Sequence, residues 1–298
     1  MKTQEVISKI ADDGVAVEEH WRLDGKLHRT DGPAIRKWVE DGEDWEEHWY
    51  LDGQLHRTDG PASYKYLDDR STARFGPDIW EKRWVVEGKL HRTNGPAIVI
   101  KDEHGYDPFV EKHWYIHGKI RRTFQYDPKT GVVEEKWYKN DVYHRTTGPA
   151  HIRRYGDDDV LEEDWYSHGK LHRIDGPAHR LWDYDGLLID EDWYSHGKLH
   201  RTDGGPAYTS IYNEVTTEIW CVNGRLHRTD RAAVRKWAEV EGTHKQWWLQ
   251  GVRYISKKKY RRAQLLLSGR QKILNATRVL TLEAKLPTDI LSTIGGFM

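Results

Sequence analysis

The stretch from Trp49 to Ala62 reads Trp-Tyr-Leu-Asp-Gly-Gln-Leu-His-Arg-Thr-Asp-Gly-Pro-Ala, and close copies of it recur along most of the chain. Each copy begins at a tryptophan, which we call the anchor, and the phrase His-Arg-Thr-Asp-Gly-Pro-Ala starts seven residues later. Nine anchors stand at positions 21, 49, 84, 114, 137, 165, 193, 220 and 247. A period of this size predicts an array of small stacked units and not a single compact core.

Each unit contains a strong signal for a β-hairpin. In the second unit, Asp52-Gly53 separates two short runs, and Asp-Gly is typical of a two-residue type I′ turn. Such a turn sets the register of the two strands, so Tyr50 should face Leu55 and Trp49 should face His56. The fold class predicted is all-β: a repeated antiparallel β-hairpin array, as a meander or solenoid, with short helical elements at both ends.

The pairing of tryptophan with histidine recurs in seven units, and we expect it to be a structural device in which imidazole lies against indole. Arg57, the next residue, should alternate to the opposite face and pair with carboxylates that tie neighbouring units together. A nucleic-acid-binding ladder of arginines is the alternative interpretation of this pattern. The expected structural anchors are Trp21, His28, Trp49, His56, Trp84, His91, Trp137, His144, Trp165, His172, Trp193, His200, Trp220 and His227.

A corner follows each hairpin. In Gly60-Pro61-Ala62, glycine permits a positive φ, proline fixes φ at the start of a strand, and alanine allows close approach of the backbone. A strand should then run out to a polar turn, and another should return to the next anchor. The fourth unit, with Arg121 to Gln125, lacks this corner, and the eighth has Arg231 to Ala233 in its place.

These strings resemble a divergent MORN-like repeat of the kind found in bacteria and large DNA viruses. The resemblance covers roughly residues 18–254 and rests on the hairpin phrase together with the Gly-Pro-Ala corner. It implies a curved array of β-hairpins that serves as an interaction scaffold or contacts membranes and other proteins. The fourth and eighth units depart from the pattern, so the surface there should differ.

The two ends of the chain differ from the array. Residues 1–15 are expected to form a capping helix from Thr3 to Ala11, residues 16–254 the nine-unit array, and residues 255–298 a basic helical segment. In that segment one helix should end at Ser268-Gly269, and a second should start at Arg270. Caps of this kind protect the open edges of a repeat array.

Charge is distributed unevenly. The whole chain has 47 basic and 48 acidic side chains, for a net charge of -1; residues 252–298 hold ten basic and two acidic ones (+8), leaving 37 and 46 upstream (-9). This tail should dock on its own acidic body as a cap, or else bind a phosphate-rich partner. The residues that would bind an anion are Lys257, Lys258, Lys259, Arg261 and Arg262.

No motif for catalysis stands out. Carboxylate clusters such as Asp190-Glu191-Asp192 are interpreted as solvated turns, and the histidines of equivalent positions should lie too far apart to share a metal ion. A single cysteine, Cys221, excludes an internal disulfide framework. We therefore expect no catalytic residues, metal or cofactor.

The function expected is that of a non-catalytic repeat scaffold that binds a protein partner. The alternatives are a structural component of a viral or phage particle, and a binder of nucleic acid or acidic membrane through the basic tail. No apolar run approaches the roughly 20 residues of a membrane span, so a soluble, cytoplasmic protein is expected, in the host cytoplasm or the virion if it is viral.

Overall fold

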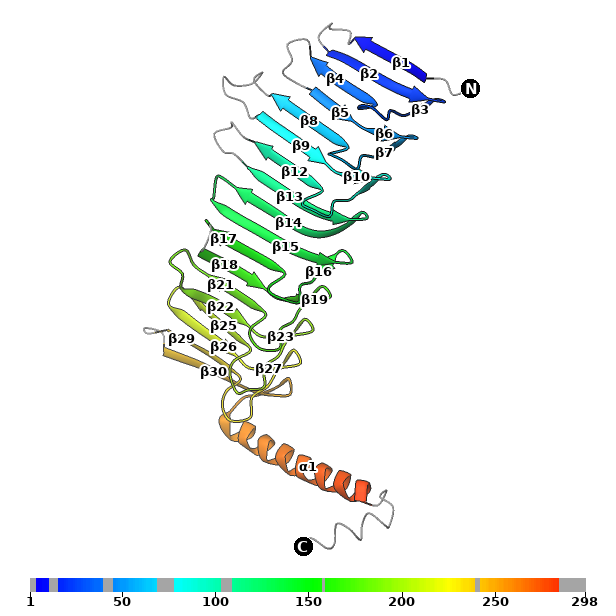
Figure 1. Cartoon of the computed structure of the whole chain (residues 1–298). Coiled ribbons are helices and arrows are strands. Elements are labelled where there is room, and N and C mark those ends of the chain that lie inside the picture. Colours follow the sequence, from blue (N-terminus) through cyan, green and yellow to red (C-terminus); the bar gives the residue numbers. More distant parts are fainter. Residues whose placement is uncertain are drawn as a thin grey trace. The chain divides into compact units, whose positions relative to one another are not determined.

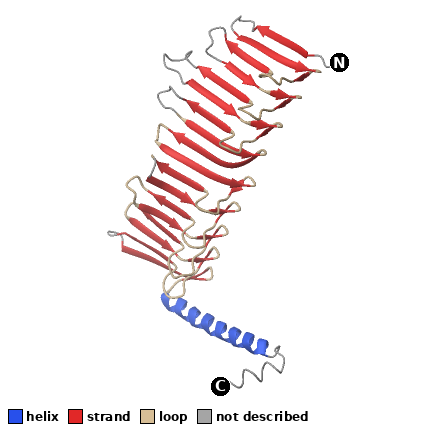
Figure 2. Ribbon diagram, in the orientation of Figure 1, coloured by secondary structure: helices blue, strands red, loops and turns tan. Residues whose placement is uncertain are grey.

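The structure is a computed structural model, and it describes residues 4–10, 16–39, 45–68, 78–102, 109–156, 159–238 and 242–283. The chain divides into two compact units, Met1–Gly197 and Lys198–Met298. Both units are built from antiparallel strands, as the repeat pattern predicts. Figure 1 labels the elements, and Figure 2 distinguishes strands from the one helix of the described residues.

The first unit contains a continuous antiparallel meander of long strands. Each long strand pairs with the next long strand along the chain, so the sheet has no crossover. The strands in order are β1 (Gln4–Ile10), β2 (Ala16–Leu23), β4 (Ile35–Val39), β5 (Trp45–His48), β8 (Ser63–Asp68), β9 (Asp78–Arg83), β12 (Ile98–Asp102), β13 (Val110–Ile116), β14 (Lys119–Asp127), β15 (Val132–Lys139), β17 (His151–Tyr155), β18 (Asp159–Asp164), β21 (His179–Trp182) and β22 (Leu188–Asp192).

Short strands form small hairpins that line up along one side of this sheet (Figure 1). They contain the Asp-Gly and His-Gly turns of the repeat, and most of their strands are two residues long. They are β3 (Lys26–Leu27), β6 (Tyr50–Leu51), β7 (Gln54–Leu55), β10 (Val85–Val86), β11 (Lys89–Leu90), β16 (Val142–Tyr143), β19 (Tyr166–Ser167), β20 (Lys170–Leu171) and β23 (Tyr194–Ser195).

The hairpin geometry confirms the register predicted from the turn. Tyr50 pairs with Leu55, and the backbone N–H of His56 donates to the carbonyl of Trp49 at 2.9 Å. Asp52 and Gly53 have φ values of 50° and 81°, which is the left-handed conformation that a type I′ turn requires at both positions. The local sequence is therefore sufficient to position this hairpin.

Successive hairpins are joined to one another by backbone hydrogen bonds. Arg29 N–H donates to the carbonyl of Tyr50 at 3.0 Å, and Gly53 N–H donates to the carbonyl of Leu27 at 2.8 Å. Each repeat thus contacts the next through its long strands and again through its hairpin.

The corner is the most buried part of the repeats that contain one. Ala62 is completely buried; its N–H donates to Arg83 of the next repeat, and its carbonyl accepts from Trp49 of its own repeat, both at 2.8 Å. The expectation of a positive φ at Gly60 is wrong, since this residue is not among those with positive φ. A Cβ at Gly60 would lie 2.8 Å from Cζ of Arg57, so glycine at this position leaves room for the guanidinium.

The second unit repeats the same plan on fewer strands and ends in a helix. Strands β25, β26, β29 and β30 pair in order, and two short hairpins accompany them. The elements are β24 (Lys198–Leu199), β25 (Tyr208–Tyr212), β26 (Val215–Ile219), β27 (Cys221–Val222), β28 (Arg225–Leu226), β29 (Val234–Ala238), β30 (Gly242–Leu249), β31 (Val252–Tyr254) and α1 (Lys257–Glu283).

The N-terminal capping helix is not formed. Residues Gln4–Ile10 are strand β1, which pairs antiparallel with β2 from Gln4 opposite Leu23 to Ile10 opposite Val17. The edge of β2 offers a row of backbone donors and acceptors, and pairing with it satisfies more groups than an isolated short helix would. The start of the array is therefore covered by a strand.

The C-terminal segment also differs from its prediction. One continuous helix, α1, runs through Ser268 and Gly269, where the sequence predicts a break. Serine and glycine each cost at most about 1 kcal/mol inside a helix, so the neighbouring good helix formers carry the helix through. The predicted cap is confirmed, because Lys259 N–H bonds Oγ of Ser256 at 3.4 Å. Pro287 and the predicted final turn lie outside the described residues.

Candidate functional site

The anchor tryptophans are covered by arginines. Cζ of Arg57 lies 4.2 Å from the ring centroid of Trp49, and Arg173 lies 3.9 Å from Trp165, distances typical of a cation–π contact. The expectation that Arg57 lies on the opposite face is therefore wrong. The same stacking occurs between Arg29 and Trp21, Arg92 and Trp84, Arg145 and Trp137, and Arg228 and Trp220.

The arginines are held in place by their own repeat. Nε of Arg57 donates to Oδ1 of Asp59 at 2.8 Å, and another guanidinium nitrogen bonds the carbonyl of Pro61 at 3.4 Å. The pairs predicted to tie neighbouring repeats together are instead contacts over two residues within one repeat. The hydrogen bond to Arg57 lowers the pKa of Asp59. The corner of the second repeat is thus a closed assembly of Trp49, Arg57, Asp59 and Pro61.

The repeated histidines join one repeat to the next. Nδ1 of His56 accepts the backbone N–H of Glu87, in the hairpin turn of the following repeat, at 3.2 Å. The imidazole is therefore a contact between repeats. Its packing against the indole of its own repeat stays a prediction. Equivalent bonds join Asp52 to His28, His117 to His91, His168 to His144, His196 to His172, Asn223 to His200 and Gln250 to His227.

The backbone part of the tryptophan–histidine prediction is confirmed for Trp165 and His172, whose N–H···O distance is 2.8 Å. Trp193 and His200 belong to different compact units, so their pairing stays a prediction. So does the expectation that these histidines bind no metal.

The fourth repeat shows how the array accommodates a missing corner. Its β14 continues straight through the position of the corner, and Arg122 lies 4.7 Å from the ring of Trp114 and 5.2 Å from that of Trp137. Arg122 and Arg154 both bind Glu135, which is buried. A buried carboxylate between two guanidinium groups is compensated and serves packing.

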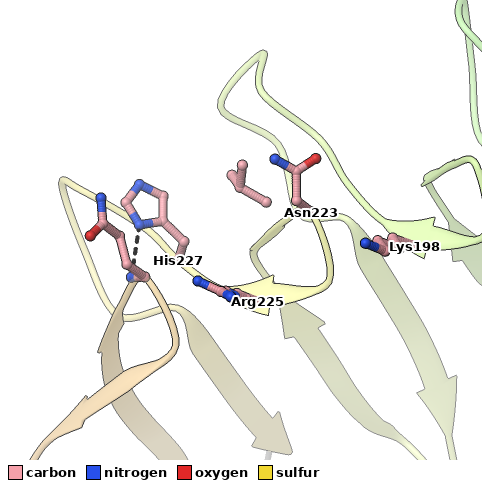
Figure 3. A pocket seen from close by; sticks show the side chains of 6 residues that line it. Lys198, Asn223, Arg225 and His227 are labelled. Atoms are coloured by element: carbon pink, nitrogen blue, oxygen red, sulfur yellow. Dashed lines mark hydrogen bonds between the residues drawn. The ribbon is translucent and has the colours of Figure 1, made fainter.

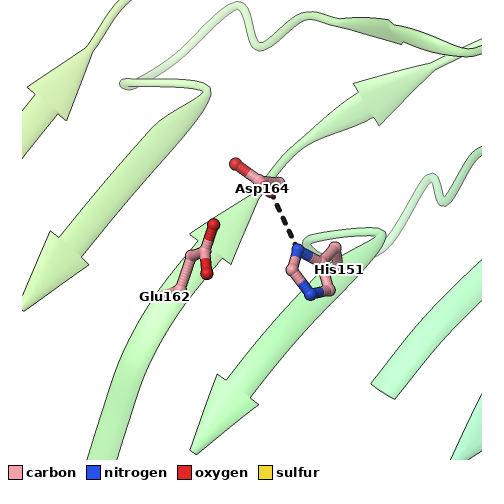
Figure 4. Close-up of side chains that lie close together, drawn as sticks. All are labelled: His151, Glu162 and Asp164. Atoms are coloured by element: carbon pink, nitrogen blue, oxygen red, sulfur yellow. Dashed lines mark hydrogen bonds and ion pairs between the residues drawn. The ribbon is translucent and has the colours of Figure 1, made fainter. Parts of the chain in front are cut away.

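One cluster of ionisable side chains stands out on the sheet of the first unit. His151 on β17 donates from Nδ1 to Oδ2 of Asp164 and from Nε2 to Oε1 of Glu134, both at 2.9 Å. His179 on β21 donates from Nδ1 to the other oxygen of Asp164 at 2.6 Å. Figure 4 shows His151 directed at Asp164, with Glu162 beside them. Both nitrogens of His151 face carboxylates, an arrangement that favours the imidazolium form.

The pKa values of this cluster follow from its contacts. Burial opposes the charge on His151, but the bonds to Asp164 and Glu134 outweigh it, and the pKa of His151 is raised. The pKa of His179 is raised in the same way by Asp164. Burial, followed by the proximity of Asp190, raises the pKa of Asp192 to about 7.

The acidic residues next to this cluster correct a prediction from the sequence. Asp190-Glu191-Asp192 does not form a solvated turn: these residues lie in β22, and Asp192 is buried with no partner for Oδ1. The sequence indicates this cluster only through the positions that its residues occupy in the repeat. Each histidine of the cluster follows a corner alanine, as in Ala178-His179, and Asp164 and Asp192 each immediately precede an anchor. Strand pairing then places these positions opposite one another, as for His179 and Asp192.

The same cluster is where a metal ion could bind. One ligand atom each from His151, Glu162 and Asp164 lie within 4.8 Å of one another, and imidazole with carboxylates suits zinc. Both nitrogens of His151 already bond to carboxylates, those of Asp164 and Glu134. The cluster is therefore explained as a charged hydrogen-bond network without a metal ion.

An aromatic patch occupies one face of the sheet in the N-terminal part of the first unit. We define it as Trp38, Trp45, Tyr64, Tyr66, Trp80 and Lys82. Strand pairing puts Trp38 opposite Trp45, Trp45 opposite Tyr66, and Tyr66 opposite Trp80, so their side chains share a face. The pattern of anchors does not include these residues, and sequence reasoning missed them.

The patch is well ordered by its own contacts. Trp45 and Tyr64 stack with centroids 4.4 Å apart and planes inclined by 6°. Nζ of Lys82 lies 4.3 Å from the ring centroid of Trp80 and 4.9 Å from that of Tyr64. All the patch residues are half-buried, so part of each side chain remains accessible.

The basic residues of the tail surround the point where α1 meets the sheet of the second unit. Tyr260 is 2 % exposed, and its hydroxyl donates to the carbonyl of Arg228. Its ring also meets Tyr254 edge-on at 6.1 Å. The first turns of α1 therefore pack on the last repeats, in agreement with a capping role. The predicted anion-binding residues Lys257, Lys258, Lys259, Arg261 and Arg262 are all exposed.

The second unit has hollows of a size that could hold a ligand. One, of about 570 Å³, opens between adjacent hairpins, where Lys198, Asn223, Arg225 and His227 line it (Figure 3). In it His227 accepts the N–H of Gln250 at 3.1 Å, so it is a groove made by the repeat contact itself. Another, lined by residues of α1, β29 and β30, holds about 660 Å³.

Comparison of the chain with protein-family models and with curated proteins finds no match. None of the helical segments in the described part of the chain combines the length and apolarity that a membrane crossing needs.

Proposed function

We propose that the chain is a non-catalytic repeat scaffold that binds a protein partner through the aromatic patch of the first unit. The observation that carries this proposal is the alignment of half-buried tryptophan and tyrosine rings on four neighbouring strands. Most anchors are half-buried too, but most of them carry a stacked arginine, as Trp49 does, whereas the patch rings lie side by side across neighbouring strands. We also propose that the repeat is MORN-like, on the resemblance of its hairpin phrase and its Gly-Pro-Ala corner.

The chemistry of the patch favours a protein partner. Tryptophan and tyrosine dominate the binding energy of protein interfaces, and they act best when surrounding contacts exclude water. The rings are already fixed by stacking and strand pairing, so binding costs little conformational entropy. Lys82, held over Trp80 and Tyr64, adds a charge that favours an acidic surface on the partner.

The opposite face of the same strands is occupied by its own ion pairs. Nζ of Lys37 lies 3.3 Å from Glu18, and Nζ of Lys65 lies 2.8 Å from Glu46. Glu46 also pairs with His48 at 3.3 Å. A face whose charges already neutralise one another offers little to a partner, so the aromatic face is the better binding surface.

The dimensions of the patch indicate the centre of an interface. It spans β4, β5, β8 and β9, which at about 4.8 Å per strand is roughly 15 Å across. A standard interface buries about 800 Å² on each partner, which is more than the patch alone provides. The patch would therefore supply the energetic centre, with polar residues around it as the rim.

The test compares partner binding by the wild type, by Trp38→Ala combined with Trp80→Ala, and by Trp182→Ala. Trp182 is also a half-buried tryptophan on a strand of the first unit, but it lies outside the patch. A partner found by cross-linking in the native source should be purified and its affinity measured. We expect at least about a hundredfold loss for the patch variant, since hot-spot residues each contribute about 2 kcal/mol or more, and little change for Trp182→Ala.

An equal loss in both variants would show that the effect is on folding, and circular dichroism would verify it. Retained affinity in a folded patch variant would refute the proposal.

The binding of an anionic ligand by the tail is a second candidate function, and the cavity beside α1 favours it.

A further inference from the structure

The cavity beside the first turns of α1 is built from three elements of the second unit. It holds about 660 Å³, within the usual range for small-ligand sites. The sheet contributes Arg235 from β29 with Lys245 and Trp247 from β30, the helix contributes Lys257 and Arg261, and the eighth corner contributes Arg231. The cavity therefore gathers cations that are far apart in the sequence.

The balance of charge in this cavity is strongly positive. Five cationic side chains line it, against one carboxylate, Asp230. That carboxylate is already engaged by Arg228 at 2.7 Å and by Arg231 at 3.6 Å, and Arg235 is paired with Glu218 at 3.1 Å. The lining thus has a charge excess that its own carboxylate does not neutralise.

The remaining cations are the ones best placed to receive a ligand. Within the described part of the chain, Lys245, Lys257 and Arg261 form no salt bridge with a carboxylate. Lys257 is the first residue of α1, and the positive end of the helix dipole adds to the attraction for an anion. The charge and the concave shape together suit a phosphate group.

Trp247 adds an aromatic ring to the cationic lining of the cavity. In the first eight repeats the residue eight positions after the anchor is an arginine, but after Trp247 it is Ile255. The ninth repeat therefore supplies no guanidinium of its own to cover this ring, and the ring lines the cavity. A half-buried indole in a cationic cavity can stack with a planar base.

Arg231 stands where the repeat has a glycine. The alignment of the eighth repeat with the second puts Arg231 at the position of Gly60. The usual glycine leaves room for the arginine of its own repeat, whereas Arg231 is largely exposed and lines the cavity. The eighth corner and the ninth anchor thus depart from the repeat in the same cavity, and both departures favour a ligand.

We propose that this cavity binds a nucleoside phosphate, either free or as part of a single-stranded nucleic acid. Lys245, Lys257 and Arg261 bind the phosphate, and Trp247 stacks with the base. Arg231 extends the cationic wall toward the corner. This site lies in the second unit and does not depend on the protein partner proposed for the first.

The test measures binding by isothermal titration with adenosine triphosphate, inorganic phosphate and acidic phospholipid vesicles, and by fluorescence anisotropy with a labelled single strand of about eight nucleotides. We expect the nucleotide or the oligonucleotide to bind, and inorganic phosphate to bind at least about tenfold more weakly, because base stacking adds affinity that phosphate alone lacks. Affinity for the oligonucleotide should fall steeply with salt. Comparison of adenosine triphosphate with the oligonucleotide distinguishes a free nucleotide from a nucleic acid.

The variants distinguish binding by the cavity from general attraction to the positive charge of the tail. Lys257→Gln with Arg261→Gln should weaken binding at least about tenfold, since hydrogen bonds to charged groups are stronger than those between neutral groups. Lys258→Gln with Lys259→Gln removes the same charge from the same turns outside the cavity lining, and should have a much smaller effect. Arg231→Gly restores the repeat residue and should also weaken binding while leaving the fold intact.

Three results would overturn the proposal. They are equal losses in the two double variants, equal affinity for inorganic phosphate and the nucleotide, and binding to vesicles with none to either nucleotide-containing ligand. Thermal denaturation of each variant would show whether a loss of binding comes from unfolding. Arg231→Gly should not disturb folding, because it introduces the residue that the Gly-Pro-Ala corners carry. A loss of binding in this variant can therefore be assigned to the cavity.

Discussion

The imidazole of His56 and the backbone N–H of Glu87 are 3.2 Å apart, and they belong to adjacent repeats. The acceptor atom is Nδ1, so the ring must be neutral at that nitrogen for the bond to form. The same relationship joins His172 to His196 at 3.3 Å, and the two rings also lie close together with centroids 4.2 Å apart. A proton on Nδ1 would remove this bond between repeats, because the nitrogen could then no longer accept the N–H.

The first prediction concerns His172. Burial, followed by the proximity of His196, lowers its pKa below the ordinary value of 6.5. The unfolded ring therefore takes up a proton more readily than the folded one, so the stability that His172 provides is present above pH 6.5 and lost as the pH falls through the folded pKa. His172→Asn should cost about 1 kcal/mol at about pH 8 and less at about pH 5.5. Urea denaturation at both values is the measurement, and an equal cost at both would contradict it.

The second prediction concerns Asp192, where the sign is reversed. Its folded pKa is raised to about 7 from the ordinary value of 3.8, so its contribution to stability is full below pH 3.8 and is lost as the pH rises through 7. Asp192→Asn removes a buried charge and should stabilise the protein at about pH 8 by about 1–2 kcal/mol, since a tenfold change in an acid dissociation constant corresponds to about 1.36 kcal/mol. The gain should vanish near pH 4, at about the pKa of an unfolded aspartate.

Denaturant midpoints at the two pH values measure this effect. Asp159→Asn, at an exposed position of β18, is the matched control and should leave stability unchanged. A loss of stability at the higher pH in Asp192→Asn would show that the charged form is favoured in the folded protein.

The third prediction concerns Gly60 and Arg57. A Cβ at position 60 would meet Cζ of Arg57 at 2.8 Å, so Gly60→Ala should shift the guanidinium over Trp49 and cost about 1 kcal/mol. In an Arg57→Ala background the same substitution should cost almost nothing. A double-mutant cycle measures this coupling, and additive costs would indicate that backbone strain, not the guanidinium, requires glycine.

The fourth prediction tests whether α1 caps the last repeats. Tyr260→Ala removes the ring that contacts Tyr254 and the hydroxyl that bonds Arg228. We expect a loss of about 3–5 kcal/mol, typical of a buried aromatic replaced by alanine, with aggregation as the final strands become accessible. Leu265→Ala, at a side chain that is 74 % exposed, is the control. Calorimetry and light scattering are the measurements; equal behaviour of both variants would rule out a cap centred on Tyr260.

The sequence alone predicted the parts of the fold that depend on neighbouring residues in the chain. Asp52-Gly53 specifies a tight turn, and that turn places Tyr50 opposite Leu55 because a two-residue loop permits only one register. The repetition of this phrase then predicts an antiparallel meander. Ser256 as the start of the C-terminal helix was predictable in the same way, since a cap is a local interaction.

Tertiary structure determined which groups the side chains contact. His56 bonds to a turn 31 residues away, and residues 4–10 form a strand because the edge of β2 offers them partners. His151 and Asp164 are brought together by strand pairing across a turn. The sequence determines the geometry of one repeat through short-range sterics, whereas the partners, burial and charge of its side chains depend on how the next repeat stacks upon it.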